Sequence, residues 1–363
     1  MSLQPGRMGV AEGLTLVVTT TVSSIFMTTW SPLLDQATTA TWMIPLVEMV
    51  LGVIVLYVFL YVFRYSSNDF FSACEKLLGL TLARLVACYY VVLFFLDAVL
   101  VLRQFTENTL ITALPELPFE IATAWYCLIV VIVLYIGIEP IARAGYIIMP
   151  MSILAGLIEL LLLIPQYQLL YLTPWNGPGL DKIILTGIHS SGINLGLLIP
   201  IILAVSFQNE QTVKASVLYG MAIGACVKSC TLAGYIAAFG VGTAREKVLP
   251  FYEIARLVYI NRYIQRTESL IILVWVINDI LQLAILTYIG LYLLGRVFNL
   301  PSVKPLIIPI LLIIANLSML PSEITDVVAF HVKAQSSFYN IGLLAIPLIL
   351  AGTVLVRKLR RNL

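Results

Sequence analysis

The chain has 363 residues, of which 60% are hydrophobic and only 11% charged, and its mean hydropathy is +1.00. Soluble globular proteins have about 45–50% apolar and about 25% charged residues, so this composition excludes that class and indicates an integral membrane protein. The formal net charge of +2 gives no basis for nucleic-acid binding.

Ten hydrophobic segments have about the 20 mostly apolar residues that a transmembrane helix needs. They are residues 11–31, 42–63, 80–112, 121–139, 142–164, 183–207, 215–240, 269–296, 304–320 and 338–356. With the N-terminus inside, twelve Lys and Arg residues fall on the cytoplasmic side and seven on the outer side. The positive-inside rule therefore predicts cytoplasmic N- and C-termini. We expect one integral membrane domain over residues 1–363.

The first and sixth spans are each interrupted near the middle by small polar residues. The first contains the run Thr-Thr-Thr-Val-Ser-Ser at 19–24, and the sixth contains Gly-Ile-His-Ser-Ser-Gly at 187–192, followed by Asn194. A weakened helix at membrane depth is tolerated only where protein or a cavity surrounds it. Matching interruptions in two halves of five spans point to a midplane ligand site, where free N–H and carbonyl groups suit a zwitterionic amino acid. The alternative is that these hydroxyls only hydrogen-bond back to their own helices.

The third span carries Asp97, Val101 and Gln104 on one face, and Arg103 and Glu107 on an adjoining face. A carboxylate near mid-span costs about 2.5–3.5 kcal/mol on insertion scales, so Asp97 should face the bundle interior and meet a partner. Arg103 and Glu107 have the i,i+4 spacing of an ion pair. They either belong to the site or only neutralise each other near the outer interface.

The seventh and eighth spans add further polar groups at membrane depth. Asn278 and Asp279 share a face of the eighth span, and Lys228 lies midway along the seventh. Lys228 could be the counter-ion of Asp97 or of Asp279, or such an ion pair could only fix the helix register. Glu48 and Glu159 lie nearer the span ends and are weaker candidates.

An amphipathic segment, residues 241–268, separates the seventh and eighth spans. It holds five of the seven outer Lys and Arg residues. Its apolar residues recur at helical spacing: Phe251, Ile254, Ala255, Val258 and Tyr259. We expect a helical lid against the outer face.

Enzymatic and metal chemistry find little support in the sequence. It has two histidines, His189 and His331, and no HExxH, GxSxG, P-loop or GxGxxG pattern. His331 is expected in a solvated outer loop. The five cysteines show neither a redox nor a zinc spacing. We expect no catalytic residue, metal or cofactor.

Short motifs occur in order along nearly the whole chain. They are PGRMG at 5–9, ATWMIP at 40–45, LPELP at 114–118, GIEPIAR at 137–143, and PFYEIAR at 250–256, which continues through QRTE at 265–268 to Trp275. Together they resemble the spore germination permease family, the B subunit of nutrient germinant receptors. That family belongs to the amino acid/polyamine/organocation transporter superfamily.

The resemblance implies an all-α fold of the LeuT type, with ten transmembrane helices in a 5+5 inverted repeat and broken first and sixth helices. The repeats would cover residues 11–164 and 183–356. It also implies a multi-pass protein of the spore inner membrane that senses a nutrient, often an amino acid, and assembles with a membrane-anchored A subunit and a lipoprotein C subunit.

By position, the resemblance carries the superfamily's ligand site onto four spans of this chain. The implied residues are Ser23, Ser24, Ile25, Asp97, Val101, Ser190, Ser191, Gly192, Asn194, Asn278 and Asp279. Ser23 and Ser24 stand where the superfamily usually has a glycine-rich break. The fifth span lacks the lysine that some proton-coupled members use, and the eighth lacks the hydroxyl pair of a sodium site. These departures favour a receptor.

Two alternatives to a receptor are kept. The first is a proton-coupled amino-acid or polyamine transporter, with Asp97, Asp279 or Lys228 as proton carrier. The second is a structural scaffold that passes water or ions and binds no solute saturably.

Overall fold

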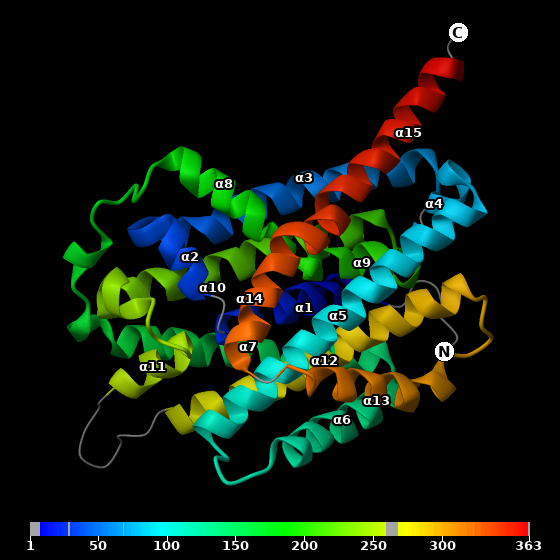
Figure 1. Ribbon diagram of the computed structural model, residues 1–363. Helices are drawn as coiled ribbons and strands as arrows, with labels where there is room; N and C mark the ends of the chain where they lie inside the picture. Colours follow the sequence, from blue (N-terminus) through cyan, green and yellow to red (C-terminus); the bar gives the residue numbers. More distant parts are fainter. Residues whose placement is uncertain (1–7, 28–29, 68, 259–267, 322, 362–363) are drawn as a thin grey trace.

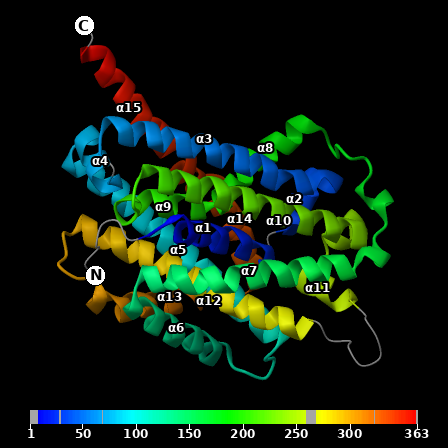
Figure 2. The same cartoon turned by 180° about the vertical axis from the view of Figure 1, so that it is seen from behind.

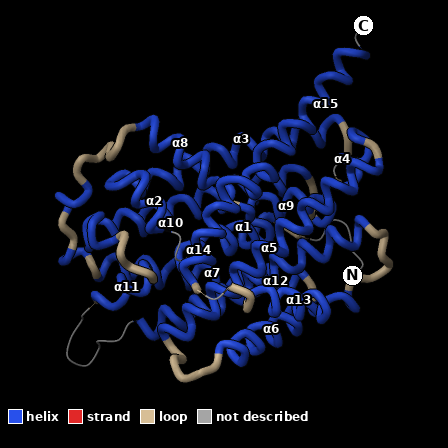
Figure 3. The backbone as a smooth tube through the Cα atoms, viewed as in Figure 1, coloured by secondary structure: helices blue, strands red, loops and turns tan. Residues whose placement is uncertain are grey.

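Helices form nearly all of the computed structural model, which describes residues 8–27, 30–67, 69–258, 268–321 and 323–361 (Figure 1). The helices of the first half are α1 (Val10–Val22), α2 (Trp30–Ala37), α3 (Ile44–Tyr65), α4 (Phe70–Leu78), α5 (Leu80–Thr112), α6 (Phe119–Ile136) and α7 (Ile138–Leu162). Those of the second half are α8 (Leu180–Ser190), α9 (Leu198–Ile202), α10 (Glu210–Ala244), α11 (Pro250–Leu257), α12 (Glu268–Val297), α13 (Ile307–Ser318), α14 (Ile324–Ala334) and α15 (Ile346–Arg361). The loops are short segments that join consecutive helices (Figure 3).

The ten predicted spans all correspond to helical stretches. Seven are long and apolar enough to cross a membrane, and an eighth consists of a pair, residues 180–193 and 195–202, that meet at 58°. Two shorter apolar stretches, Val10–Phe26 and Lys304–Ser318, correspond to the first and ninth predicted spans. The prediction of an all-helical membrane protein is confirmed.

The first span departs from α-helical geometry later than the polar run predicts. Thr19, Thr20 and Thr21 lie inside α1, and a 3₁₀ turn begins at Ser23 and continues to Phe26. Met27 is extended, with φ −83° and ψ 155°. The helix therefore changes at the second half of the polar run.

Helices α1 and α10 lie side by side within the bundle (Figures 1 and 2). Gly220 and Gly224 of α10 allow this close approach. A Cβ added at Gly220 would lie 2.7 Å from the Cβ of Val17, and one at Gly224 would lie 2.6 Å from Cγ2 of Thr21. Lipid tails are as apolar as leucine, so helices in a bilayer associate through such close packing of small residues.

The last span is longer than predicted and irregular. Instead of residues 338–356 alone, α14 begins at Ile324 and leads through two π-helical stretches, Gln335–Tyr339 and Ile341–Ala345, into α15. Wide turns of this kind often occur at functional sites.

Part of the predicted lid is helix α11. Its side chains Phe251, Ile254 and Ala255 are buried. Phe251 makes an edge-to-face contact with Phe26, at a centroid distance of 5.2 Å, so α11 covers the end of the first span. Residues 241–244 instead complete α10, and residues 259–267 lie outside the described residues.

Candidate functional site

The sixth span breaks at Asn194. This residue has φ −91° and ψ 44°, and 3₁₀ turns flank it at Ser191–Ile193 and Leu195–Leu197. The backbone N–H of Asn194 donates to the carbonyl of Ser191, at 3.0 Å. The break therefore falls at the end of the polar run that the sequence singles out.

A buried ion pair lies against this break. Nζ of Lys228 on α10 is 3.1 Å from Oε2 of Glu48 on α3, and their side chains are only 10% and 3% exposed. Ser190 donates to Oε1 of Glu48 at 2.7 Å, and Nδ2 of Asn194 donates to Oε2 at 2.9 Å. Nζ of Lys228 also donates to Oδ1 of Asn194, at 3.5 Å. Buried charges persist when they are both paired and hydrogen-bonded, as here.

This pairing corrects two expectations. Lys228 is not the counter-ion of Asp97 or Asp279; its partner is Glu48. The hydrophobic run begins at residue 42, and this start puts Glu48 near a span end. Helical structure instead extends back to Trp30, through α2 and a 3₁₀ stretch, so Glu48 in the second turn of α3 lies well inside it.

The other side of the break packs against the last span. Oγ of Ser191 donates to Oδ1 of Asn340 at 2.8 Å, and Nδ2 of Asn340 donates to the carbonyls of Ile188 and His189, each at 2.9 Å. A Cβ added at Gly192 would lie 2.8 Å from Cβ of Tyr339. Asn340 thus holds two carbonyls next to the break, and Gly192 permits the close contact.

A cavity of about 110 Å³ adjoins the break. Its lining includes residues of α2, the sixth span and the last span: Pro32, Leu33, Gln36, Thr186, His189, Ser190, Ile193, Val332, Gln335 and Ser336. It has room for several water molecules. Because Ser190 both lines the cavity and donates to Glu48, a solute there would be one hydrogen bond from the ion pair.

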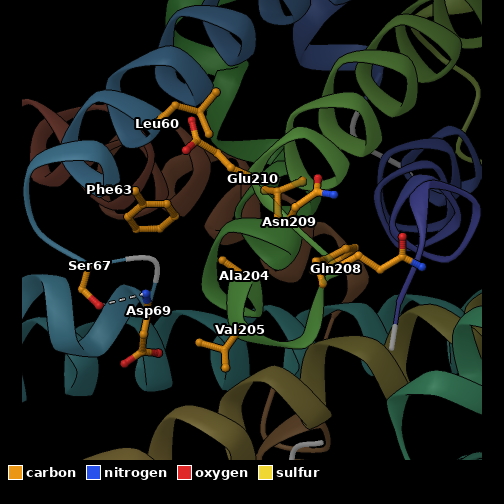
Figure 4. A pocket seen from close by; sticks show the side chains of 11 residues that line it. Leu60, Phe63, Ser67, Asp69, Ala204, Val205, Gln208, Asn209 and Glu210 are labelled. Carbon is orange, nitrogen blue, oxygen red and sulfur yellow. Dashed lines mark hydrogen bonds between the residues drawn. The ribbon is translucent and has the colours of Figure 1, made fainter. Parts of the chain in front are cut away.

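A second cavity, of about 310 Å³, opens where α3 ends and α10 begins (Figure 4). Asp69, Asn209 and Glu210 contribute polar groups, while Leu60 and Phe63 line its apolar side. None of the predicted ligand residues lines it.

Asp97 forms its contact with the last span. Oδ1 of Asp97 is 3.2 Å from Nε2 of His331, and Nδ1 of His331 is 2.7 Å from Nε2 of Gln104. An amide nitrogen can only donate, so Nδ1 accepts from Gln104 and Nε2–H donates to Asp97. His331 is 1% exposed, and the expectation of a solvated outer loop is wrong because α14 begins at Ile324.

The predicted residues of the eighth span lie where α12 meets α1, α5 and α7. Nδ2 of Asn278 donates to Oγ of Ser152 on α7, at 2.7 Å. Trp275, one turn before Asp279, stacks on Phe26 at 5.8 Å between ring centroids. Nδ2 of Asn108 on α5 donates to the carbonyl of Phe26, at 3.1 Å. These contacts join the end of the first span to α5 and α12.

Several polar atoms in this region have no hydrogen bond among the described residues. Asp279 is fully buried, and neither of its carboxylate oxygens is hydrogen-bonded. The same holds for Oδ1 of Asn278 and Oγ of Ser23, while the indole N–H of Trp275 lies within reach of the Asp279 carboxylate. Buried polar groups are nearly always satisfied, so a cluster of unsatisfied ones calls for a further partner.

The remaining predicted residues have structural contacts. Oγ of Ser24 donates to the carbonyl of Thr21, at 2.7 Å, as the back-bonding alternative expects. Ile25 and Val101 are buried in apolar clusters. Arg103 and Glu107 form the expected pair, at 3.2 Å, with the Arg103 guanidinium 4.4 Å from the centre of the Phe119 ring.

The predicted ligand residues therefore do not converge on one point. The structure divides them among the ion pair at the sixth-span break, the Asp97–His331 pair, and the unsatisfied groups of α12. Sequence reasoning missed Asn340, ranked Glu48 as a weaker candidate and expected His331 in a loop. Among the described residues, no three His, Cys, Asp or Glu side chains cluster as metal ligands.

Comparisons with known proteins agree on family and fold. The sequence model of a family described as "Spore germination protein" matches residues 7–327. No curated protein matches. Among solved structures, a mutant of the Eremococcus coleocola manganese transporter has 13% identity and a TM-score of 0.61, over 95% of this chain and 76% of that one. MhsT in complex with L-phenylalanine has 16% identity and a TM-score of 0.61, over 97% and 99%. These similarities establish a LeuT-type transporter fold.

Proposed function

The chain belongs to the family of spore germination proteins, and we propose from this premise that it senses a small zwitterionic nutrient, an amino acid, at mid-membrane. In this proposal the protein resides in the spore inner membrane with both termini cytoplasmic. It works with an A-type and a C-type receptor subunit. Nutrient binding against the first span changes the packing of the first and sixth spans, and that change is passed to the partners.

The unsatisfied Asp279 carboxylate is the observation that carries this proposal. A buried carboxylate without a hydrogen bond is costly, and an ammonium group would relieve that cost. Asn278 and Ser23 also have unused oxygens, and the indole N–H of Trp275 beside Asp279 is a further polar group of this site. An amino acid offers both a cation and an anion to such a mixed set of groups. MhsT, which is similar in fold, is in complex with L-phenylalanine, and this supports the choice of an amino acid.

We assign the remaining predicted residues to positioning. Ser190 and Asn194 tie the sixth-span break to Glu48, and Ser191 ties it to Asn340. Movement at the break would therefore disturb α3, α10 and the last span together. Through these hydrogen bonds, a change caused by nutrient binding would reach helices at the surface of the bundle.

The test is ligand-dependent thermal stabilisation of the purified chain across the common L-amino acids. We expect one or a few to raise the melting temperature of the wild type and of Asp326→Asn, in which an exposed carboxylate is changed to an amide. Asp279→Asn should fold but lose the stabilisation. A normal response in Asp279→Asn would show that the site is elsewhere.

A second candidate function, proton-coupled amino-acid transport, is favoured by the buried Asp97–His331 pair. A carboxylate and an imidazole at membrane depth are groups from which proton relays are built. Proteoliposomes containing this chain alone would separate the two functions. Uptake of labelled amino acid that requires a pH gradient and is lost in Asp97→Asn would establish transport. Binding without uptake would leave the receptor role.

A further inference from the structure

A basic cavity of about 530 Å³ lies where the C-terminal part of α15 passes the ends of α3 and α4. In Figures 1 and 2, α15 and α4 are on the same side of the molecule, and α15 extends beyond the bundle. The cavity is lined by Tyr65, Lys76, Leu77, Val354, Arg357, Lys358 and Arg360. Four of the seven lining residues are cations and none is acidic.

Three of the four cations are held in place by groups other than carboxylates. Arg357 donates from Nη1 to the carbonyl of Lys76 and from Nη2 to that of Leu77, each at 2.9 Å, and so caps the end of α4. Nζ of Lys76 donates to the carbonyl of Ser66, at 2.8 Å. Nζ of Lys358 lies 5.2 Å from the centre of the Tyr65 ring. Among the described residues, none of the four cations forms a salt bridge, so their charge is available to an anion.

The surroundings of the cavity are apolar. Leu77 and Val354 line it, and the same stretch of α15 exposes Leu355, Val356 and Leu359, which are 52%, 52% and 65% exposed. Apolar side chains exposed on a spanning helix face the acyl chains of lipid. The cavity therefore combines a cluster of cations with an apolar border, at the point where the last span leaves the bilayer.

We propose that this cavity binds the phosphate headgroup of an anionic phospholipid, with Lys76, Lys358 and Arg360 around the phosphate and Leu77 and Val354 against the glycerol and acyl region. Basic pockets between spanning helices are suited to such headgroups. A lipid seated there would connect α3, α4 and the last span. A soluble anion or an acidic protein segment would use the charge but not the apolar border.

The experiment measures binding of phosphatidylglycerol to the purified full chain in a neutral detergent, by native mass spectrometry, against phosphatidylcholine of the same chain length. The wild type should retain phosphatidylglycerol preferentially. Lys358→Gln/Arg360→Gln should weaken its binding about 30-fold, since each cation near an anionic headgroup contributes measurably. Lys304→Gln/Lys333→Gln, which removes two exposed cations elsewhere, should bind as the wild type does. Arg357 is left intact because it caps α4.

Three results would overturn the proposal. Equal retention of the two lipids would exclude recognition of the anionic headgroup. Equal losses in the two double variants would reduce the effect to general surface charge. Displacement of the lipid by millimolar inorganic phosphate would assign the cavity to a soluble anion. If the double variant does not fold, Lys358→Gln alone should weaken binding about fivefold, and unchanged binding in that variant would also exclude the proposal.

Discussion

Glu48 and Lys228 form a buried ion pair, with 3.1 Å between Oε2 and Nζ, against the break of the sixth span. The pair connects the second span to the seventh, and both residues also hydrogen-bond to Asn194. The broken segment is therefore held by charges that belong to two other helices. A rearrangement at Asn194 must exchange these hydrogen bonds for others.

Removing one member of this pair should destabilise the protein strongly. Lys228→Met leaves Glu48 buried and unpaired, and we expect a loss of about 3–5 kcal/mol in the free energy of unfolding. The double variant Glu48→Leu/Lys228→Met should lose less than Lys228→Met alone, because no charge is then left buried. Denaturant unfolding in detergent, analysed as a double-mutant cycle, measures the coupling. Additive effects of the two substitutions would contradict the pairing.

Close packing of α1 on α10 should make Gly220 intolerant of any side chain. The added Cβ of Gly220→Ala would contact Val17, so we expect a loss of about 1–3 kcal/mol despite the better helix propensity of alanine. Gly242→Ala, in the last turn of α10 beyond the non-helical Gly240, is the control, since nothing lies within 4 Å of its added Cβ. It should be neutral or slightly stabilising. The measurement is the melting temperature of each variant relative to the wild type. Equal melting temperatures for the two variants would contradict the close packing at Gly220.

The contact of His331 with Asp97 should make a polar residue necessary at position 331. His331→Phe removes the hydrogen bonds that the imidazole makes with Asp97 and Gln104, and we expect a loss of about 1–3 kcal/mol. His331→Gln keeps a donor and an acceptor and should retain most of the stability. Thermal unfolding of both variants tests this. Equal effects would mean that only the volume of the side chain matters.

Cys74 should be unreactive in the folded protein. Burial, with a contribution from the charge of Asp69, raises the pKa of the Cys74 thiol on α4 from 9.0 to about 12. The thiolate is the reactive form, and a raised pKa lowers its fraction at every pH below 12. A chain whose only cysteine is Cys74 should therefore react slowly with maleimide from pH 7 to 9 when folded, and rapidly when unfolded. Fast labelling of the folded chain would contradict the buried environment.

Hydropathy and the polar runs predict the number of spans and the break of the sixth, because both depend on local composition. The partners of the buried charges depend instead on where each helix begins. A second span beginning at residue 42 puts Glu48 near the interface, whereas the helical stretch from Trp30 puts it opposite Lys228. A last span beginning at residue 338 leaves His331 in a loop, whereas α14 puts it beside Asp97. The direction in which Asn278 and Asp279 point depends on how α12 is rotated about its axis. That rotation is set by packing against other helices and cannot be predicted from the sequence of one span.

The π-helical stretches of the last span make its contact with the sixth sensitive to register. Asn340 lies between the two wide stretches, and its amide holds the carbonyls of Ile188 and His189. If the first stretch tightened into ordinary α-helical turns, every residue beyond it would rotate by about 100° around the axis. Asn340 would then leave those carbonyls, and Ser191 would lose one of its two acceptors. A rotation of the last span about its own axis would thus make or break its hydrogen bonds to the broken sixth span.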